Sequence, residues 1–273
     1  MNNLDVLILH MPHSGTEIPD KTGYVVPDEV LCAEANLIKD WGVEEIFGIE
    51  GVDRLKPVFS RLFCDVERFR QDEEEPLAEK GFGFAYTRCQ DGSVMRELSK
   101  DDKDRIAKKY YDPHHRDFER LTDKKLQEFG FVFIVDCHTF PAVPIAWEEP
   151  SEEPRPDICI GTCMAMSPQN IRKYTIKYFE EKGYSVGWNY PYTGTIMPDK
   201  YFRLANDRVK GMMIEINRRL FFDEQTMQMD ADALKRLRGE IKELLETIST
   251  MEVERQKCRD NPDVYLVMEN EDA

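Results

Sequence analysis

Short apolar runs, each closed by polar or turn-forming residues, recur along this chain. They are residues 5–11, 57–64, 131–137, 157–161, 184–188 and 211–217. Runs of this length bounded by Pro, Gly or charged residues predict buried β-strands. The segment 81–87, which alternates Gly with aromatic residues, predicts a short strand or an extended pocket wall. The charged segment after the second run, 65–76, predicts a loop.

Between these runs, apolar residues recur at helical spacing. The predicted helices are 28–48, 100–128, 168–182, 199–207 and 229–258. Pro27 stands near the start of the first, where proline is favoured. Pro113 interrupts the second, in which Tyr111 and His115 are four residues apart and so are expected on one face.

The alternation of strand and helix patterns predicts an α/β fold with a mixed, mostly parallel sheet and helices on both faces. No linker or repeat divides the chain. We therefore predict a single α/β domain over 1–273, in which 223–273 forms a C-terminal helix and tail packed on the rest; the tail adds an edge strand or covers the surface. In such a sheet the carboxyl ends of the strands form the ligand crevice.

Composition narrows the class of partner. The net charge of −16 argues against nucleic acid and anionic membranes and favours a small polar substrate. A pocket lined by Arg could still bind an anion. The electrostatic field of the net charge is screened over about 10 Å, so the charges inside the pocket outweigh it. A homo-oligomer stays open.

Cysteine usage and the N-terminal segment bear on the compartment. The seven cysteines form no CxxC pair, so neither a disulfide framework nor a thiolate zinc site is indicated. The first residues lack the features of a signal peptide, and no apolar run reaches the roughly 18 residues of a membrane span. These features predict a cytoplasmic protein.

Polar residues at the ends of the apolar runs carry the candidate chemistry. His13, Asp65 and His138 each follow a run, and Glu215 lies inside one. Two histidines and two carboxylates are the parts of a metal-assisted hydrolase, with imidazole ligands and a carboxylate base.

Each residue also has a structural interpretation. His13 can stabilise its turn, and His138 can be satisfied by backbone, although Asp136 lies on the same side of the strand and could fix its imidazole. Glu215 can pair with Arg218 or Arg219; left unpaired, its carboxylate would be costly to bury.

The same region offers a substrate clamp and excludes other hydrolase classes. Arg68 follows Asp65 closely and in a crevice would clamp a carboxylate with two hydrogen bonds. HExxH, GxSxG and Walker motifs are all missing from the sequence. Cys137 and His138 are adjacent on a strand and should point to opposite faces, which argues against a thiol dyad.

Taken together, eight motifs in order resemble the N-formylglutamate amidohydrolase family. They are PHSGTEIP, DWGVEEIF, CDVERF, YYDPHHRDF, VDCHTF, DICIGT, PYTGTIMP and EINRRLF, and they run from about residue 8 to about residue 222. The resemblance implies a phosphorylase/hydrolase-like fold of the zinc carboxypeptidase type. It also implies one Zn²⁺ ion and hydrolysis of the amide of an N-formyl or N-acyl amino acid.

Carried over residue by residue, the resemblance implies His13 and His138 as zinc ligands, with Asp40 on the first helix as the third and Glu17 as the alternative. It implies Glu215 as the general base and proton shuttle. Arg68 is implied as a catalytic and substrate clamp. The remaining substrate-binding candidates are Ser14, His115, Asn217 and Arg218.

One position departs from the family pattern. Glu67 stands next to Arg68, where the family has Asn. This difference removes an amide donor and adds a negative charge. This difference indicates a substrate other than formylglutamate as an alternative. The alternatives are a carboxypeptidase-like peptidase and a non-catalytic relative that binds a small anion.

Overall fold

The computed structural model describes residues 3–145, 148, 153–204 and 206–259. Six strands form one sheet in the order β2-β1-β3-β6-β4-β5. Their bounds are β1 (Leu7–His10), β2 (Asp53–Leu55), β3 (Val132–Phe140), β4 (Ile158–Gly161), β5 (Val186–Trp188) and β6 (Val209–Asn217). Strands β2, β1, β3 and β6 are parallel, whereas β4 runs antiparallel to β6 and β5 follows β4. The predicted mixed, mostly parallel sheet is confirmed.

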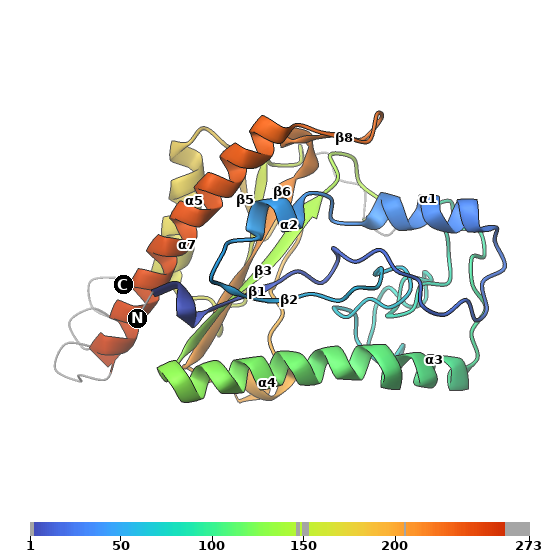
Figure 1. Ribbon diagram of the computed structural model, residues 1–273, viewed down its shortest axis with the longest axis horizontal. Coiled ribbons are helices and arrows are strands. Elements are labelled where there is room, and N and C mark those ends of the chain that lie inside the picture. Colours follow the sequence, from blue (N-terminus) through green and yellow to red (C-terminus); the bar gives the residue numbers. More distant parts are fainter. Residues whose placement is uncertain (1–2, 146–147, 149–152, 205, 260–273) are drawn as a thin grey trace.

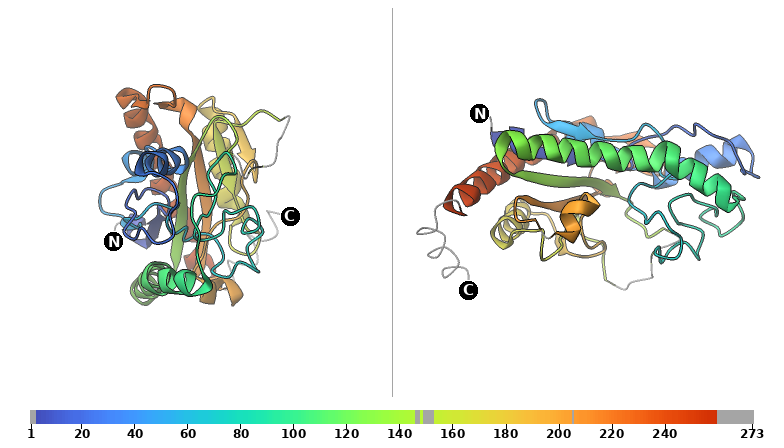
Figure 2. Two further views of the ribbon diagram at one scale, coloured as in Figure 1. Left: turned by 90° about the vertical axis from the view of Figure 1, so that its right-hand side faces the viewer. Right: turned by 90° about the horizontal axis from the view of Figure 1, so that it is seen from below.

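Helices cover both faces of this sheet (Figures 1 and 2). One face packs against α2 (Val43–Phe47), α5 (Gln169–Glu181) and α7 (Ala231–Arg259) through a large apolar cluster. The other face packs against α4 (Asp112–Phe129) and α6 (Asp199–Arg203). Alternation along β3 explains the division, because Val135 and Cys137 point to the first core while Asp136 and His138 point to the opposite side. The predicted separation of Cys137 from His138 is thus confirmed.

The remaining elements are short and lie around the sheet or at its carboxyl edge. They are η1 (Asn3–Val6), α1 (Asp28–Ile38), α3 (Lys100–Ile106), the π turn η2 (Ala107–Tyr111), η3 (Arg218–Leu220), β7 (Phe222–Asp223) and β8 (Gln228–Met229). None of the helices within the described ranges has both the length and the apolar character of a membrane span.

Two predictions about elements were wrong. The segment 57–64 forms turns rather than a strand, and the second strand in sequence is instead β2. For the segment 81–87, only the strand alternative was wrong: the segment forms no regular strand, and most of it is buried. Both segments belong to the region 56–99. This region consists mostly of turns, which pack into two apolar clusters beyond the sheet edge. Their apolar residues therefore reflect burial without ladder pairing. The predicted edge strand or cover in the tail 260–273 lies outside the described residues.

The predicted helix 28–48 is divided in two. It breaks after Ile38, and Gly42 adopts a left-handed conformation with φ of 75° before α2 begins. Asp40 consequently lies in the connection between α1 and α2 and not on a helix. Its backbone N–H donates to the carbonyl of His13, 3.1 Å away, which ties the connection to the turn after β1.

The predicted interruption of the helix 100–128 is a π turn. Helix α3 passes into η2 and then into α4, with Pro113 at the start of α4. Single π turns occur often at functional sites. Here the turn precedes two histidines, and the rings of Tyr111 and His115 lie 4.3 Å apart, as their spacing predicted.

Candidate active site

The carboxyl ends of three parallel strands bring four polar side chains to neighbouring positions. His10 ends β1 and pairs in register with Asp136 of β3, and His138 of β3 pairs in register with Glu215 of β6. Register thus sets the lateral spacing of these groups through the backbone ladder. A cavity of about 1460 Å³ opens over this edge and is lined by Asp136, His138 and Glu215.

His138 is held by carboxylates on both ring nitrogens. Its Nδ1 lies 2.9 Å from Asp40 Oδ2, and its Nε2 lies 3.1 Å from Asp136 Oδ1 and 3.4 Å from Glu67 Oε1. Burial alone would lower the pKa of His138, but the surrounding carboxylates, Glu67 first, raise it well above its usual range. The expected contact between Asp136 and His138 is confirmed.

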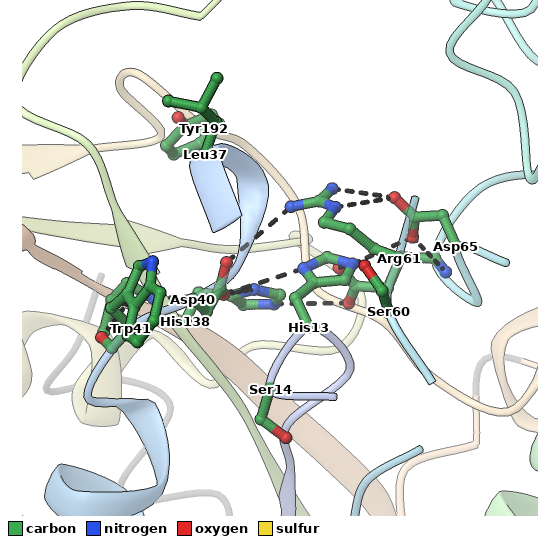
Figure 3. A network of polar contacts seen from close by, with 12 residues as sticks. His13, Ser14, Leu37, Asp40, Trp41, Ser60, Arg61, Asp65, His138 and Tyr192 are labelled. Atoms are coloured by element: carbon green, nitrogen blue, oxygen red, sulfur yellow. Dashed lines mark hydrogen bonds and ion pairs between the residues drawn. The ribbon is translucent and has the colours of Figure 1, made fainter. Parts of the chain in front are cut away.

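His13 lies beside His138, with ring centroids 5.0 Å apart. Its Nε2 is 2.9 Å from Asp65 Oδ1 and 3.3 Å from Glu67 Oε2, while its buried Nδ1 has no hydrogen-bond partner within the described part of the chain. Asp65 is in turn held by Arg61 and by the hydroxyl of Tyr86. Figure 3 shows part of this network, including the contacts of Asp40 with His13, His138 and Arg61.

Glu67 completes a group of metal-ligating side chains. One ligand atom each from His13, Glu67 and His138 lie within 4.8 Å of one another, which suits a divalent ion. Asp40 is close by, but its carboxylate accepts hydrogen bonds from His138 Nδ1 and from the backbone N–H of Thr139. Burial would raise the pKa of Asp40, but its contacts with His13 and His138 keep this pKa below the usual range. A carboxylate bonded to an imidazole in this way is also found next to metal-bound histidines.

The loop that carries Glu67 is braced from the helix with the π turn. His115 Nε2 lies 2.9 Å from the carbonyl oxygen of Val66, and the hydroxyl of Tyr111 donates to the carbonyl of Arg68 at 2.8 Å. These contacts flank Glu67 on both sides. His115, which was predicted to bind substrate, lines the cavity and also performs this structural task.

Glu215 carries a buried carboxylate that forms no ion pair with an arginine among the described residues. Its Oε2 has no hydrogen-bond partner among the described residues, and burial raises its pKa to about 8. The structural alternative, an ion pair with a neighbouring arginine, is not realised: Arg219 binds Asp157, and Arg218 donates to the carbonyl of Leu37.

Two arginines in the cavity wall are only weakly engaged by carboxylates. Arg68 approaches Asp65 no closer than 3.8 Å, and Arg218 approaches Glu224 at 4.0 Å. The Nε atoms of both are buried without hydrogen-bond partners. Both line the cavity, as predicted for residues that hold a substrate carboxylate.

Three predicted site residues lie outside the cavity lining. The hydroxyl of Ser14 faces the carbonyl of Met11, and Figure 3 shows it pointing away from the histidines. The side-chain amide of Asn217 donates a hydrogen bond to the carbonyl of Pro156 and accepts one from the backbone N–H of Arg219. Glu17 is exposed and pairs through its backbone with Phe59. Because these three side chains do not line the cavity, the predicted roles of Ser14, Asn217 and Glu17 are corrected.

Sequence reasoning missed His10, His114, Arg61 and Glu67 as parts of the site. His10 Nδ1 lies 3.0 Å from Asp136 Oδ1, and its Nε2 lies 3.0 Å from His114 Nε2. The sequence did contain a signal for His10, because this residue lies in the apolar run that precedes the turn of His13. Glu67 was noticed in the sequence only as a repulsive charge.

The comparisons with known proteins agree with this architecture. A crystal structure of N-formylglutamate amidohydrolase from Ralstonia eutropha JMP134 superposes with a TM-score of 0.76 at 23% identity, over 90% of this chain and 93% of that one. A gene product of Agrobacterium tumefaciens superposes with a TM-score of 0.65 at 19% identity, over 92% and 94%. A search of curated protein sequences found no match.

A sequence model of a protein family gives the more specific result. The model of N-formylglutamate amidohydrolase matches residues 6–222, a span that contains every histidine and carboxylate of the site described above. The two structures establish the shared fold, and the family model adds a hydrolase that acts on an amide. This chain belongs to the N-formylglutamate amidohydrolase family.

Proposed function

We propose that this protein is a zinc-dependent amidohydrolase that cleaves the amide of an N-formyl or N-acyl amino acid. The observation that carries the proposal is the joint placement of His13, Glu67 and His138 beside the unpaired carboxylate of Glu215 at the base of one cavity. Imidazole and carboxylate ligands are those that catalytic zinc sites use.

The residues fit such an ion by two criteria. The buried Nδ1 of His13 has no hydrogen-bond partner among the described residues, and Asp40 fixes Nδ1 of His138 so that Nε2 faces Glu67. We assign His13, His138 and Glu67 as the ligands, with Asp40 orienting His138. Bound there, zinc would polarise the amide carbonyl and lower the pKa of water.

Glu215 supplies the proton transfer. Its pKa of about 8 lies near the operating pH, where a group can both accept and return a proton. In this proposal Glu215 Oε2 takes the proton of the attacking water and returns it to the amine that leaves. A nearby cation would lower the pKa of Glu215 from about 8 toward neutrality.

Arg68 and Arg218 orient the substrate. Both side chains line the cavity, Arg68 half-buried and Arg218 buried, and the carboxylates nearest to them are 3.8 and 4.0 Å away. A substrate carboxylate would complete their hydrogen bonding, which places the scissile amide relative to Glu215. In this proposal Glu67 is a metal ligand. Its negative charge therefore does not argue against an anionic substrate such as N-formylglutamate.

A Glu215→Gln variant tests the proton-transfer role. We expect kcat for N-formyl amino acids to fall by about 10²- to 10⁴-fold with zinc content unchanged, because the amide cannot accept the proton. Glu17→Gln is the matched control, since Glu17 is exposed and outside the cavity lining; it should retain full activity.

Substrate comparison separates this function from its alternatives. N-formylglutamate, other N-acyl amino acids and dipeptides would be assayed on the zinc-loaded protein. Preference for dipeptides would indicate a peptidase, and binding of these compounds without hydrolysis would indicate a non-catalytic relative. A fully active Glu215→Gln variant would overturn the mechanism.

A further inference from the structure

A second group of metal-ligating side chains adjoins the first. One ligand atom each from His10, Glu67 and Asp136 lie within 4.8 Å of one another. His10 Nδ1 is 3.0 Å from Asp136 Oδ1 and 3.8 Å from Glu67 Oε1. Because His10 and Asp136 are register partners on adjacent strands, the backbone ladder holds this pair in place.

Glu67 faces both groups at once. Its Oε2 is 3.3 Å from His13 Nε2, while its Oε1 is 3.4 Å from His138 Nε2 and 3.8 Å from His10 Nδ1. Oε2 thus faces the first set, and Oε1 reaches a histidine of each set. A carboxylate placed between two sets of ligands is the arrangement of a bridge in two-metal sites, whose ions lie about 3.5–4 Å apart.

The other partners of His10 and Asp136 are those that metal ligands require. His10 is fully buried, stacks on Phe118, and has its Nε2 3.0 Å from His114 Nε2. A hydrogen on His10 Nε2 donated to His114 leaves Nδ1 with its lone pair facing the two carboxylates. Asp136 Oδ2 accepts the backbone N–H of Ile196 at 3.1 Å, which orients Oδ1.

The geometry points to a second divalent cation, held by His10, Asp136 and the shared carboxylate of Glu67. The donor set of one imidazole and two carboxylates suits Zn²⁺ or Mn²⁺ and is richer in oxygen than the first set. The inference rests on the proposed function in that Glu67 is a ligand of both ions. A chain of hydrogen bonds from His114 through His10 to Asp136, without a cation, is the competing arrangement.

Metal stoichiometry on the full chain decides between them. The metal-free protein would be dialysed against Zn²⁺ alone and Mn²⁺ alone, and bound metal would be measured by elemental analysis. We expect two equivalents in the wild type at saturation and one in His10→Asn. His114→Gln is the matched control: it removes only the outer partner, so the second equivalent should bind about 10- to 100-fold more weakly and still saturate.

A wild type that saturates at one equivalent, or a His10→Asn variant that keeps two, would overturn the second cation. If His10→Asn does not fold, anomalous diffraction of the wild type with Mn²⁺ decides, since a peak beside His10 Nδ1 is required. Hydrolysis of N-acyl amino acids by a protein saturated at one equivalent would sustain the proposed function and reject this inference. Two equivalents without any such hydrolysis would do the reverse.

Discussion

Glu67 lies at the centre of the charges in the site. Its carboxylate is within 4 Å of a ring nitrogen of His10, His13 and His138. From the sequence it looked like an unfavourable substitution, because the pattern placed it beside Arg68 in a substrate clamp. The turn after Asp65 instead directs it to the histidines, an effect of local backbone geometry that no spacing rule supplies.

This placement predicts an order of zinc affinity among carboxylate variants. Glu67→Gln should reduce affinity most, because it removes a ligand. Asp40→Asn should reduce it by about 10- to 100-fold, because it perturbs the orientation of His138. Glu17→Gln should leave it unchanged. Competition with a chromogenic chelator measures all three, and a larger loss for Asp40→Asn than for Glu67→Gln would restore Asp40 as the third ligand.

The raised pKa of Glu215 predicts how the stability of the metal-free protein depends on pH. The folded pKa is about 8, whereas an unfolded Glu titrates near 4.5, so the folded state binds the extra proton between these values. Stability from this group is present below about 4.5 and is lost as pH rises toward 8, by at most about 1.4 kcal/mol per pH unit.

The Glu215→Gln variant isolates this contribution because it cannot ionise. The difference in free energy of unfolding between variant and wild type should move in favour of the variant from pH 5 to pH 8 and level off above. Urea unfolding in the presence of a chelator measures it. A difference that stays constant over this range would contradict the raised pKa.

At the scale of elements, the break between α1 and α2 positions Asp40. Gly42 makes the break with a φ of 75°, and a Cβ there would lie 2.4 Å from Cε2 of Phe221. The connection can therefore reach the turn of His13 only if this position carries no side chain.

Gly42→Ala should accordingly destabilise the protein by about 1–3 kcal/mol and weaken zinc binding, since it combines backbone strain with a clash. Gly51→Ala is the matched control. Gly51 also has a positive φ, of 82°, but a Cβ there would meet nothing within 4 Å, so only about 1 kcal/mol of backbone strain is expected. Urea unfolding and zinc titration of both variants check this; equal losses would show that the contact with Phe221 is unimportant.

Sequence patterns predicted the elements that are continuous and buried, and failed where burial comes without regular pairing. Strands β3 and β6 were evident because most of their residues are apolar. The segment 57–64 has the same composition but packs as turns under Phe82 and Tyr110, so its apolar residues carry no periodicity to distinguish the two cases. His13, His138 and Glu215 could be placed because strand ends converge. His10 and His114 meet across 104 positions of sequence, and only the packing of α4 on the sheet brings them together.

At the scale of the whole molecule, the acidic balance has a local counterpart. The chain carries a net charge of −16, and five carboxylates converge at the site, from Asp40, Asp65, Glu67, Asp136 and Glu215. Arg61 pairs with Asp65, whereas Glu67 and Asp136 face histidine rings. A bound cation would therefore stabilise the folded state as well as supply chemistry.

Metal removal should lower Tm. An ion present at one hundred times its Kd contributes about 2.7 kcal/mol to stability, which corresponds to several degrees for a chain of this size. Calorimetry before and after chelation, with Zn²⁺ restored afterwards and Mg²⁺ as the control ion, measures the effect. An unchanged Tm together with unchanged activity would exclude a metal centre.

All five histidines of the chain belong to one network, linked through ring contacts and shared carboxylates. Magnetic resonance of the imidazole groups is therefore free of background from the rest of the molecule. Every such signal reports on the active site, and tautomers, metal loading and substrate binding can be followed in the intact protein without any label placed by mutation.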